Sequence, residues 1–257
     1  MSLQAPIKAI YFDLDDTLCA YWDAAKDGLK TAFTELGPAE HPTEIWLSHW
    51  AAAFREFCPT IKKSDWYPIY LQNGEPTRTE LMRLTLLKGG MDDQSLAKRI
   101  SDRYGEARDQ ALVLFEDALE ALELAQSIGP VGLITNGPAD IQRQEVNSLG
   151  IAHRFDHILI EGEMGIGKPH ESVFQRALEL AKASAAEALF VGNSYDHDIR
   201  PAIAAGWQTY WVRRESDVPP SALGAAEHME SIGNEDPQPT MTGPSFAELI
   251  EALKKIK

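Results

Sequence analysis

Three carboxylates follow directly after the first apolar segment of the chain. Residues 7–12 are mostly apolar, and Asp13, Asp15 and Asp16 come immediately after them. A carboxylate packed against the end of an apolar strand has a large desolvation cost unless a cation or a reaction justifies its place. We therefore expect a reactive or metal-binding site at this point of the chain.

Later apolar segments also end in polar residues that are capable of catalysis or ligand binding. Each residue alone has an ordinary explanation as a helix cap, a turn hydroxyl or a surface charge. Their shared position after apolar segments is what makes them candidates. They are Thr135 and Asn136 after segment 131–135, Lys168 after segment 157–160, and Asn193 and Asp198 at and after the end of segment 189–193.

The elements that must position these residues alternate between strands and helices. Short apolar runs predict strands at 7–12, 131–135, 157–160, 189–193 and 208–212. Amphipathic patterns predict helices at 115–128, 138–149, 172–183, 198–205 and 245–256. This alternation is typical of an α/β protein with a Rossmann-like parallel sheet and helices on both faces. In such a sheet, ligands bind beyond the carboxyl ends of the strands.

Residues 19–111 follow a different pattern. Their apolar positions recur at helical spacing, no strand pattern interrupts them, and four of the six tryptophans lie among them. We therefore predict an all-helical domain at 19–111, inserted into an α/β core domain formed by 1–18 and 112–257. Residues 214–243, rich in proline, serine and acidic residues, are predicted to form a long surface loop.

Composition and charge exclude several classes of protein. The net charge of −15 argues against nucleic acid or an anionic membrane as a partner, since either requires a basic surface. No apolar run approaches the length of a transmembrane helix. The two cysteines form no metal-ligand spacing, and the first strand begins near the N-terminus, so we expect a cytoplasmic protein. Its oligomeric state is left open between monomer and homodimer.

With these motifs in order, the chain resembles the haloacid dehalogenase superfamily, specifically its phosphatases with a helical cap inserted after the first motif. The family's D-x-D-x-T motif is present as Asp13-Leu14-Asp15-Asp16-Thr17. Its strand ending in Ser or Thr corresponds to Thr135, and its lysine, often followed by proline, corresponds to Lys168. Its fourth motif usually reads G-D-x-x-x-x-D; here Asn193 replaces the first aspartate and Asp198 is the second.

The resemblance implies a role for each of these residues. Asp13 would be the nucleophile that takes the phosphoryl group, and Asp15 would be the general acid and base. Thr135, Asn136 and Lys168 would bind the phosphate of a small phosphorylated metabolite.

The resemblance also implies a Mg²⁺ cofactor. Its ligands would be Asp13, the backbone carbonyl of Asp15, Asn193 and Asp198, the last directly or through water. Mg²⁺ favours oxygen ligands and retains several waters, so a few such groups suffice. The amide of Asn193 can coordinate the ion but brings no negative charge, which predicts a lower affinity than aspartate would give.

Two other functions remain open from the sequence. A metal-independent haloacid dehalogenase also uses an aspartate nucleophile and tolerates asparagine in the fourth motif, but it generally lacks the second aspartate, which Asp15 supplies here. A binding or regulatory protein that keeps the fold without turnover is supported only by Asn193.

Overall fold

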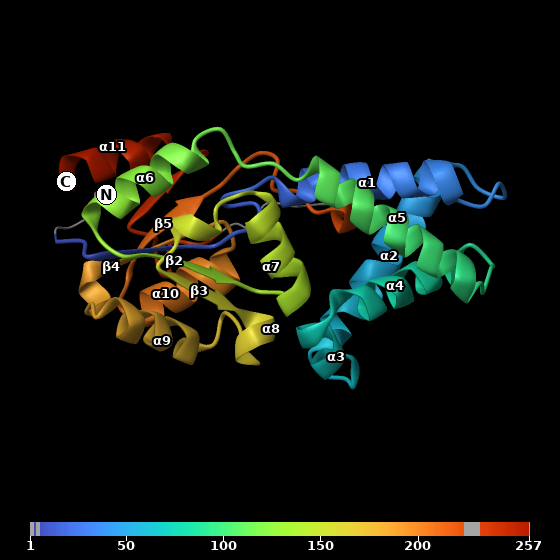
Figure 1. Cartoon of the computed structure of the whole chain (residues 1–257), viewed down its shortest axis with the longest axis horizontal. Helices are drawn as coiled ribbons and strands as arrows, with labels where there is room; N and C mark the ends of the chain where they lie inside the picture. Colours follow the sequence, from blue (N-terminus) through green and yellow to red (C-terminus); the bar gives the residue numbers. More distant parts are fainter. Residues whose placement is uncertain (1–2, 4–5, 224–231, 257) are drawn as a thin grey trace.

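The computed structural model describes residues 3, 6–223 and 232–256. Within these residues, a six-stranded parallel sheet has helices on both faces, and a second group of helices is inserted after the first strand (Figure 1). The α/β architecture predicted from the sequence is confirmed.

The sheet brings the first strand to its centre. The strand order is β3-β2-β1-β4-β5-β6, and every neighbouring pair is parallel. The chain adds strands on one side of β1 and then crosses to the other side, so the order reverses between β1 and β4. A ligand crevice is expected beyond the carboxyl ends of these two strands. The strands are β1 (Ala9–Phe12), β2 (Val131–Thr135), β3 (His157–Ile160), β4 (Ala188–Gly192), β5 (Gln208–Val212) and β6 (Met241–Gly243).

The wholly apolar sequence of β1 follows from its burial on both faces. Ile10 and Phe12 belong to the apolar cluster that contains α6 (Ala118–Ile128) and α11 (Ala247–Ile256). Ala9 and Tyr11 belong to the opposite cluster, with α9 (Glu171–Ala181) and α10 (Arg200–Ala204). Figure 1 shows these two helix pairs on opposite sides of the sheet. Two further helices, α7 (Ala139–Ser148) and α8 (Glu161–Met164), follow β2 and β3.

The inserted helices have an apolar core of their own, which contains the buried Trp46 and Trp50. Helix α1 packs closely against α5 at Gly28, where a Cβ atom would lie 2.9 Å from the backbone nitrogen of Arg108. In Figure 1 the group extends from one end of the sheet, beside α7 and α8. The helices are α1 (Tyr21–Leu36), α2 (Thr43–Ile61), α3 (Trp66–Gln72), α4 (Gly74–Lys88) and α5 (Gln94–Ala111).

The structure corrects the sequence predictions at several short elements. The predicted loop 214–243 ends in β6, which pairs with β5 in parallel, so that part of the prediction is wrong; residues 224–231 lie outside the described part. Three residues are too few to show an alternating pattern. The sequence also missed α3 and α8, which have seven and four residues. Among the described residues, no helix is both long and apolar enough to cross a membrane.

Candidate active site

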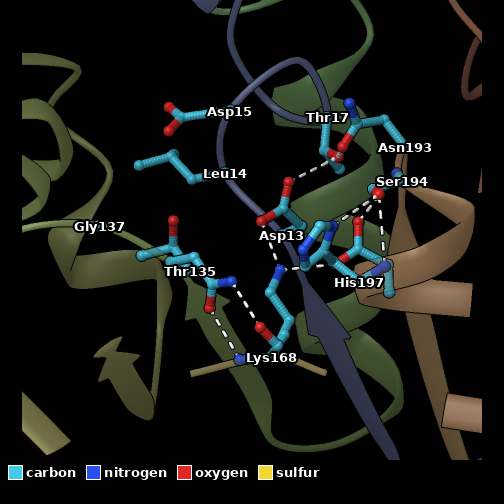
Figure 2. A network of polar contacts seen from close by, with 12 residues as sticks. Asp13, Leu14, Asp15, Thr17, Thr135, Gly137, Lys168, Asn193, Ser194 and His197 are labelled. Carbon is cyan, nitrogen blue, oxygen red and sulfur yellow. Dashed lines mark hydrogen bonds and ion pairs between the residues drawn. The ribbon is translucent and has the colours of Figure 1, made fainter. Parts of the chain in front are cut away.

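Lys168 joins two acidic residues that follow different strands. Its Nζ atom lies 2.6 Å from Oδ1 of Asp13, directly after β1, and 2.6 Å from Oδ1 of Asp198, beyond β4 (Figure 2). The exposed fractions of Asp13, Lys168 and Asp198 are 7%, 2% and 1%. Two carboxylates around one ammonium leave a negative charge in a buried place, which favours a further cation.

Burial and charge set the ionisation of this group. Desolvation raises the pKa of Asp13 to about 6, with Lys168 opposing the rise and Asp198 adding to it. Desolvation alone would lower the pKa of Lys168, but Asp13 and Asp198 together hold it above its usual value. At neutral pH, Asp13 is therefore ionised and Lys168 is charged.

The loop that carries Lys168 is held by Asn136. The side-chain Oδ1 of Asn136 accepts from the backbone N–H of Lys168 at 2.8 Å, and its Nδ2 donates to the Lys168 carbonyl at 2.8 Å. The side chain of Asn136 thus positions the lysine. Its predicted role in binding phosphate remains a prediction.

Asp15 occupies a different environment from Asp13, although only two residues separate them. Figure 2 shows its carboxylate directed away from Asp13 and Lys168. Its Oδ2 accepts from Nε2 of Gln142, on α7, at 3.1 Å. Desolvation, with the charge of Asp13 adding to it, raises the pKa of Asp15 to about 7. A carboxyl group with this pKa can both give and take a proton near neutral pH.

Gln142 is a site residue that the sequence reasoning missed. Besides binding Asp15, it accepts from the hydroxyl of Thr135 at 2.6 Å and donates to Oε2 of Glu145 at 2.8 Å. Its position in the sequence could have indicated it: the helix after β2 begins at the sheet edge, so polar residues in its first turns can face the strand ends. Gln142 therefore connects Asp15 to Thr135, the residue predicted to bind phosphate.

Glu145 continues this network to the inserted helices. It has 1% exposure and lies 3.8 Å from Nη2 of Arg108, on α5. Its Oε1 atom is buried and has no hydrogen-bond partner among the residues that the structure describes. Desolvation, followed by repulsion from Asp15, raises the pKa of Glu145 well above 4.5, with Arg108 opposing the rise.

We expect Glu145→Gln to stabilise the protein increasingly as the pH rises. The pKa of Glu145 is higher in the folded state than its value of 4.5 in the unfolded state. The contribution of this carboxyl to stability is therefore full below pH 4.5, where it is protonated in both states, and is lost as the pH rises above that value. The difference in free energy of unfolding between the variant and wild type should grow by at most about 1.4 kcal/mol per pH unit. Melting temperatures of both proteins from about pH 5 to about pH 8 check this. A variant that becomes less stable than wild type at high pH would show instead that ionised Glu145 stabilises Arg108.

Two oxygens beyond β1 and β4 converge on one hydroxyl. The hydroxyl of Thr17 lies 3.0 Å from Oδ2 of Asp13 and 3.2 Å from Oδ1 of Asn193. Nδ2 of Asn193 donates to Oδ2 of Asp217 at 2.9 Å, which leaves the amide oxygen facing the hydroxyl of Thr17. The sequence reasoning missed Asp217 because it lies in the loop after β5, where no pattern indicated a function.

These groups fit a hard cation such as Mg²⁺. A carboxylate oxygen of Asp13 and the amide oxygen of Asn193 both lie next to the Thr17 hydroxyl, and both are ligand types that Mg²⁺ accepts. Asp198 is engaged elsewhere: its Oδ1 binds Lys168 and its Oδ2 accepts from the N–H of Ser194 at 3.0 Å. No group of three or more His, Cys, Asp or Glu side chains in the described residues has the arrangement of a metal site. The predicted ligand set is not of this kind, because it includes the amide of Asn193 and the backbone carbonyl of Asp15.

The structure brings every predicted site residue to one cavity of about 420 Å³, here called the Asp13 cavity. A second cavity of about 330 Å³, here called the Arg78 cavity, lies between the inserted helices and α7. The two share Asp15, Trp22 and Asn136. The predicted residues that line the Asp13 cavity are Asp13, Asp15, Thr135, Asn136, Lys168, Asn193 and Asp198.

The strand order defines a class of α/β hydrolase, together with the acidic residues and the lysine that follow the strand ends. The chain belongs to the haloacid dehalogenase-like hydrolases, whose family description matches residues 7–206. A second, HAD-hydrolase-like description matches residues 165–249.

Individual relatives and solved structures are similar over much of the chain. A glyceraldehyde 3-phosphate phosphatase of Pyrococcus abyssi is 35% identical, over 80% of this chain and 82% of the relative. A phosphoserine phosphatase of Thermus thermophilus is 34% identical over 54% of this chain, and the match spans only 55% of that relative. The crystal structure of a 2-haloacid dehalogenase from Pseudomonas syringae is 27% identical, with a TM-score of 0.63, covering 98% of this chain and 100% of that one.

Proposed function

We propose that this protein is a Mg²⁺-dependent phosphatase that hydrolyses a small phosphorylated metabolite through an aspartyl-phosphate on Asp13. The observation that carries the proposal is the pair of acids after β1. Asp13 is held by Lys168, whereas Asp15 lies apart, is held by Gln142 and borders both cavities. The phosphatase names of the relatives from Pyrococcus abyssi and Thermus thermophilus support the same reaction.

The residues divide the reaction between them. An ionised oxygen of Asp13 attacks phosphorus, the bond from phosphorus to the alcohol oxygen breaks, and Asp15 gives its proton to that oxygen. Asp15 then takes a proton from water, the water oxygen attacks phosphorus, and phosphate leaves with Asp13 restored. Lys168 would offset the charge of the phosphoryl oxygens. The hydroxyl of Thr135 would hold one of them after turning away from Gln142, because its single proton cannot serve both acceptors.

Asp13, Asn193 and the backbone carbonyl of Asp15 would hold the Mg²⁺, which supplies positive charge next to the phosphoryl oxygens. Asp198 would contact the Mg²⁺ through a water molecule, or would influence it only through its ion pair with Lys168. We propose that the inserted helices, residues 19–111, form a cap domain that covers the reacting groups and excludes bulk water.

A dehalogenase is the second candidate, favoured by Asn193 and by the similarity to the Pseudomonas syringae enzyme. A halide leaving group requires no proton, so the separate, hydrogen-bonded position of Asp15 would have no use in that reaction. The test is a screen of phosphomonoesters with and without Mg²⁺, with 2-chloropropionate assayed for chloride release in parallel. Release of phosphate only with Mg²⁺ supports the proposal; release of chloride without metal overturns it. Binding of phosphoesters without any turnover would indicate a regulatory protein.

We expect Asp217→Ala to raise the Mg²⁺ concentration needed for half-maximal activity by about tenfold. Loss of a side chain that orients a metal ligand typically costs this much or more in affinity. Asn193→Asp alone would place a carboxylate 2.9 Å from that of Asp217, whereas Asn193→Asp with Asp217→Asn keeps the hydrogen bond and adds charge at the ion. The double variant should therefore need less Mg²⁺ than wild type.

Asp196→Asn is the control, because Asp196 lies three residues after Asn193 but is exposed and paired with Arg200. Titration of initial rates against Mg²⁺ gives the half-maximal concentrations of all four proteins. Identical concentrations in wild type, Asp217→Ala and the double variant would remove Asn193 from the list of metal ligands.

A further inference from the structure

The Arg78 cavity is placed to receive the alcohol part of the substrate. It meets the Asp13 cavity at Asp15, and the carboxylate of Asp15 points away from Asp13 (Figure 2). A general acid must contact the leaving oxygen, so the group attached to that oxygen extends past Asp15. This placement rests on the proposed function.

Six aromatic side chains, all from the inserted helices, line the Arg78 cavity, and α7 and the loop before it complete its wall. Aromatic walls favour a ring or another flat apolar group in the ligand. The aromatic residues that line it are Tyr21, Trp22, Trp50, Phe54, Tyr70 and Tyr104.

Three cationic side chains line the same cavity, and two of them already have acidic partners. Nζ of Lys62 lies 2.7 Å from Glu161, and Nη2 of Arg108 lies 2.7 Å from Asp109. Arg78 differs from both. Its Nε donates to the hydroxyl of Ser101 at 3.1 Å, and within the described part of the chain no carboxylate forms an ion pair with it. A half-buried guanidinium without an acidic partner is suited to bind an anion.

The backbone of α5 is shaped to seat this guanidinium. Gly105 lies inside α5, where glycine costs about 1 kcal/mol relative to alanine. A Cβ atom at residue 105 would lie 3.1 to 3.2 Å from the central carbon and the two terminal nitrogens of Arg78. The glycine therefore allows the guanidinium plane to lie against the helix.

We propose that the substrate is a phosphomonoester whose alcohol part carries a carboxylate, and that Arg78 binds this carboxylate in the Arg78 cavity. Arg78 would determine specificity and take no part in the transfer of the phosphoryl group. Its fork of N–H donors matches a carboxylate in two parallel hydrogen bonds.

The test compares two synthetic esters that differ in charge but hardly in shape, 4-carboxyphenyl phosphate and 4-carbamoylphenyl phosphate. Their kcat/KM ratio is measured for wild type, Arg78→Gln and Arg83→Gln with Mg²⁺ present. Comparing the ratio between variants cancels the difference in intrinsic reactivity of the two esters. Arg83 is the matched control, because it lies on the same helix but pairs with Glu80 and Asp92 and does not line the cavity.

The ratio should fall by about 10- to 100-fold from wild type to Arg78→Gln, as expected for losing a hydrogen-bonded charge pair. It should stay unchanged in Arg83→Gln. Most of the loss should lie in the carboxyl ester, because the carbamoyl ester loses only a hydrogen bond to a neutral oxygen. Gly105→Ala, which displaces the guanidinium without removing it, should lower the ratio by a smaller factor and serves if Arg78→Gln does not fold.

An equal ratio in wild type and both variants, with brisk hydrolysis of both esters, would overturn the role of Arg78 and leave the phosphatase intact. A ratio that falls equally in Arg83→Gln would overturn it as well, since the effect would then be general. No hydrolysis of either ester or of p-nitrophenyl phosphate would instead contradict the proposed function.

Discussion

Asp13→Asn is expected to lower kcat by roughly 10⁴-fold or more, because it removes the attacking oxygen and the reaction has no other route. The fold should survive, since an amide oxygen can still accept from Lys168, which lies 2.6 Å from Oδ1 of Asp13. With one carboxylate fewer around one ammonium, the buried group becomes neutral, so the melting temperature should be equal or higher. Steady-state kinetics with Mg²⁺ and thermal unfolding check the two expectations together.

Asp16→Asn is the matched control for this variant. Asp16 is 2% exposed, has a φ of 57°, and accepts from the N–H of Trp22 at 3.0 Å. Asparagine tolerates this left-handed conformation and can accept the same hydrogen bond, so kcat should change by only a few-fold. If Asp13→Asn kept wild-type activity, or if the two variants lost equal activity, Asp13 would not be the nucleophile.

Lys168→Met is expected to damage both activity and stability. It leaves Asp13 and Asp198 buried at 7% and 1% exposure without their shared counter-charge. Removing one partner of a buried ion pair typically costs about 3–5 kcal/mol of folding free energy. Removing a charged donor from a reacting group typically lowers kcat by about 10²- to 10³-fold. Chemical denaturation and kinetics at saturating Mg²⁺ measure the two losses.

The control is Lys98→Met, which removes a lysine whose partners Asp102 and Glu75 lie in solvent-accessible positions. Surface ion pairs of this kind contribute little, so stability and kcat should match wild type. If Lys168→Met matched wild type in kcat as well, Lys168 would serve only to hold the two carboxylates together.

The sheet could be predicted because its central strands, β1, β2 and β4, are buried on both faces. A strand such as β1 must then be apolar at every position, and the change to Asp13 marks its carboxyl end. The parallel arrangement then requires such ends to meet at one edge, which explains why Thr135, Lys168 and Asn193 could be placed together from the sequence. Short elements such as β6 are fixed by neighbouring strands, and no pattern within three residues reveals them.

The side-chain contacts within the site could not be predicted. Whether Asp198 faces an ion or Lys168 depends on rotamers and on loops from three different strands. Gln142 and Asp217 contact site residues that are distant in the sequence. Gln142 is 127 residues from Asp15, and Asp217 is 24 residues from Asn193. Arg78 is one of several arginines in the inserted helices. Two features that distinguish it are visible only in the structure: no carboxylate among the described residues forms an ion pair with it, and the backbone at Gly105 leaves room for its guanidinium.

The most direct test of the central claim is to trap the phosphoryl group on the protein. Asp15→Asn keeps Asp13 but removes the base that activates water, so with Mg²⁺ and p-nitrophenyl phosphate, whose leaving group requires little protonation, the phosphorylated protein should accumulate. Rapid acid quench followed by peptide mass spectrometry should find one phosphoryl group, on Asp13. Steady release of phosphate by this variant without any adduct, or an adduct on another residue, would contradict the account.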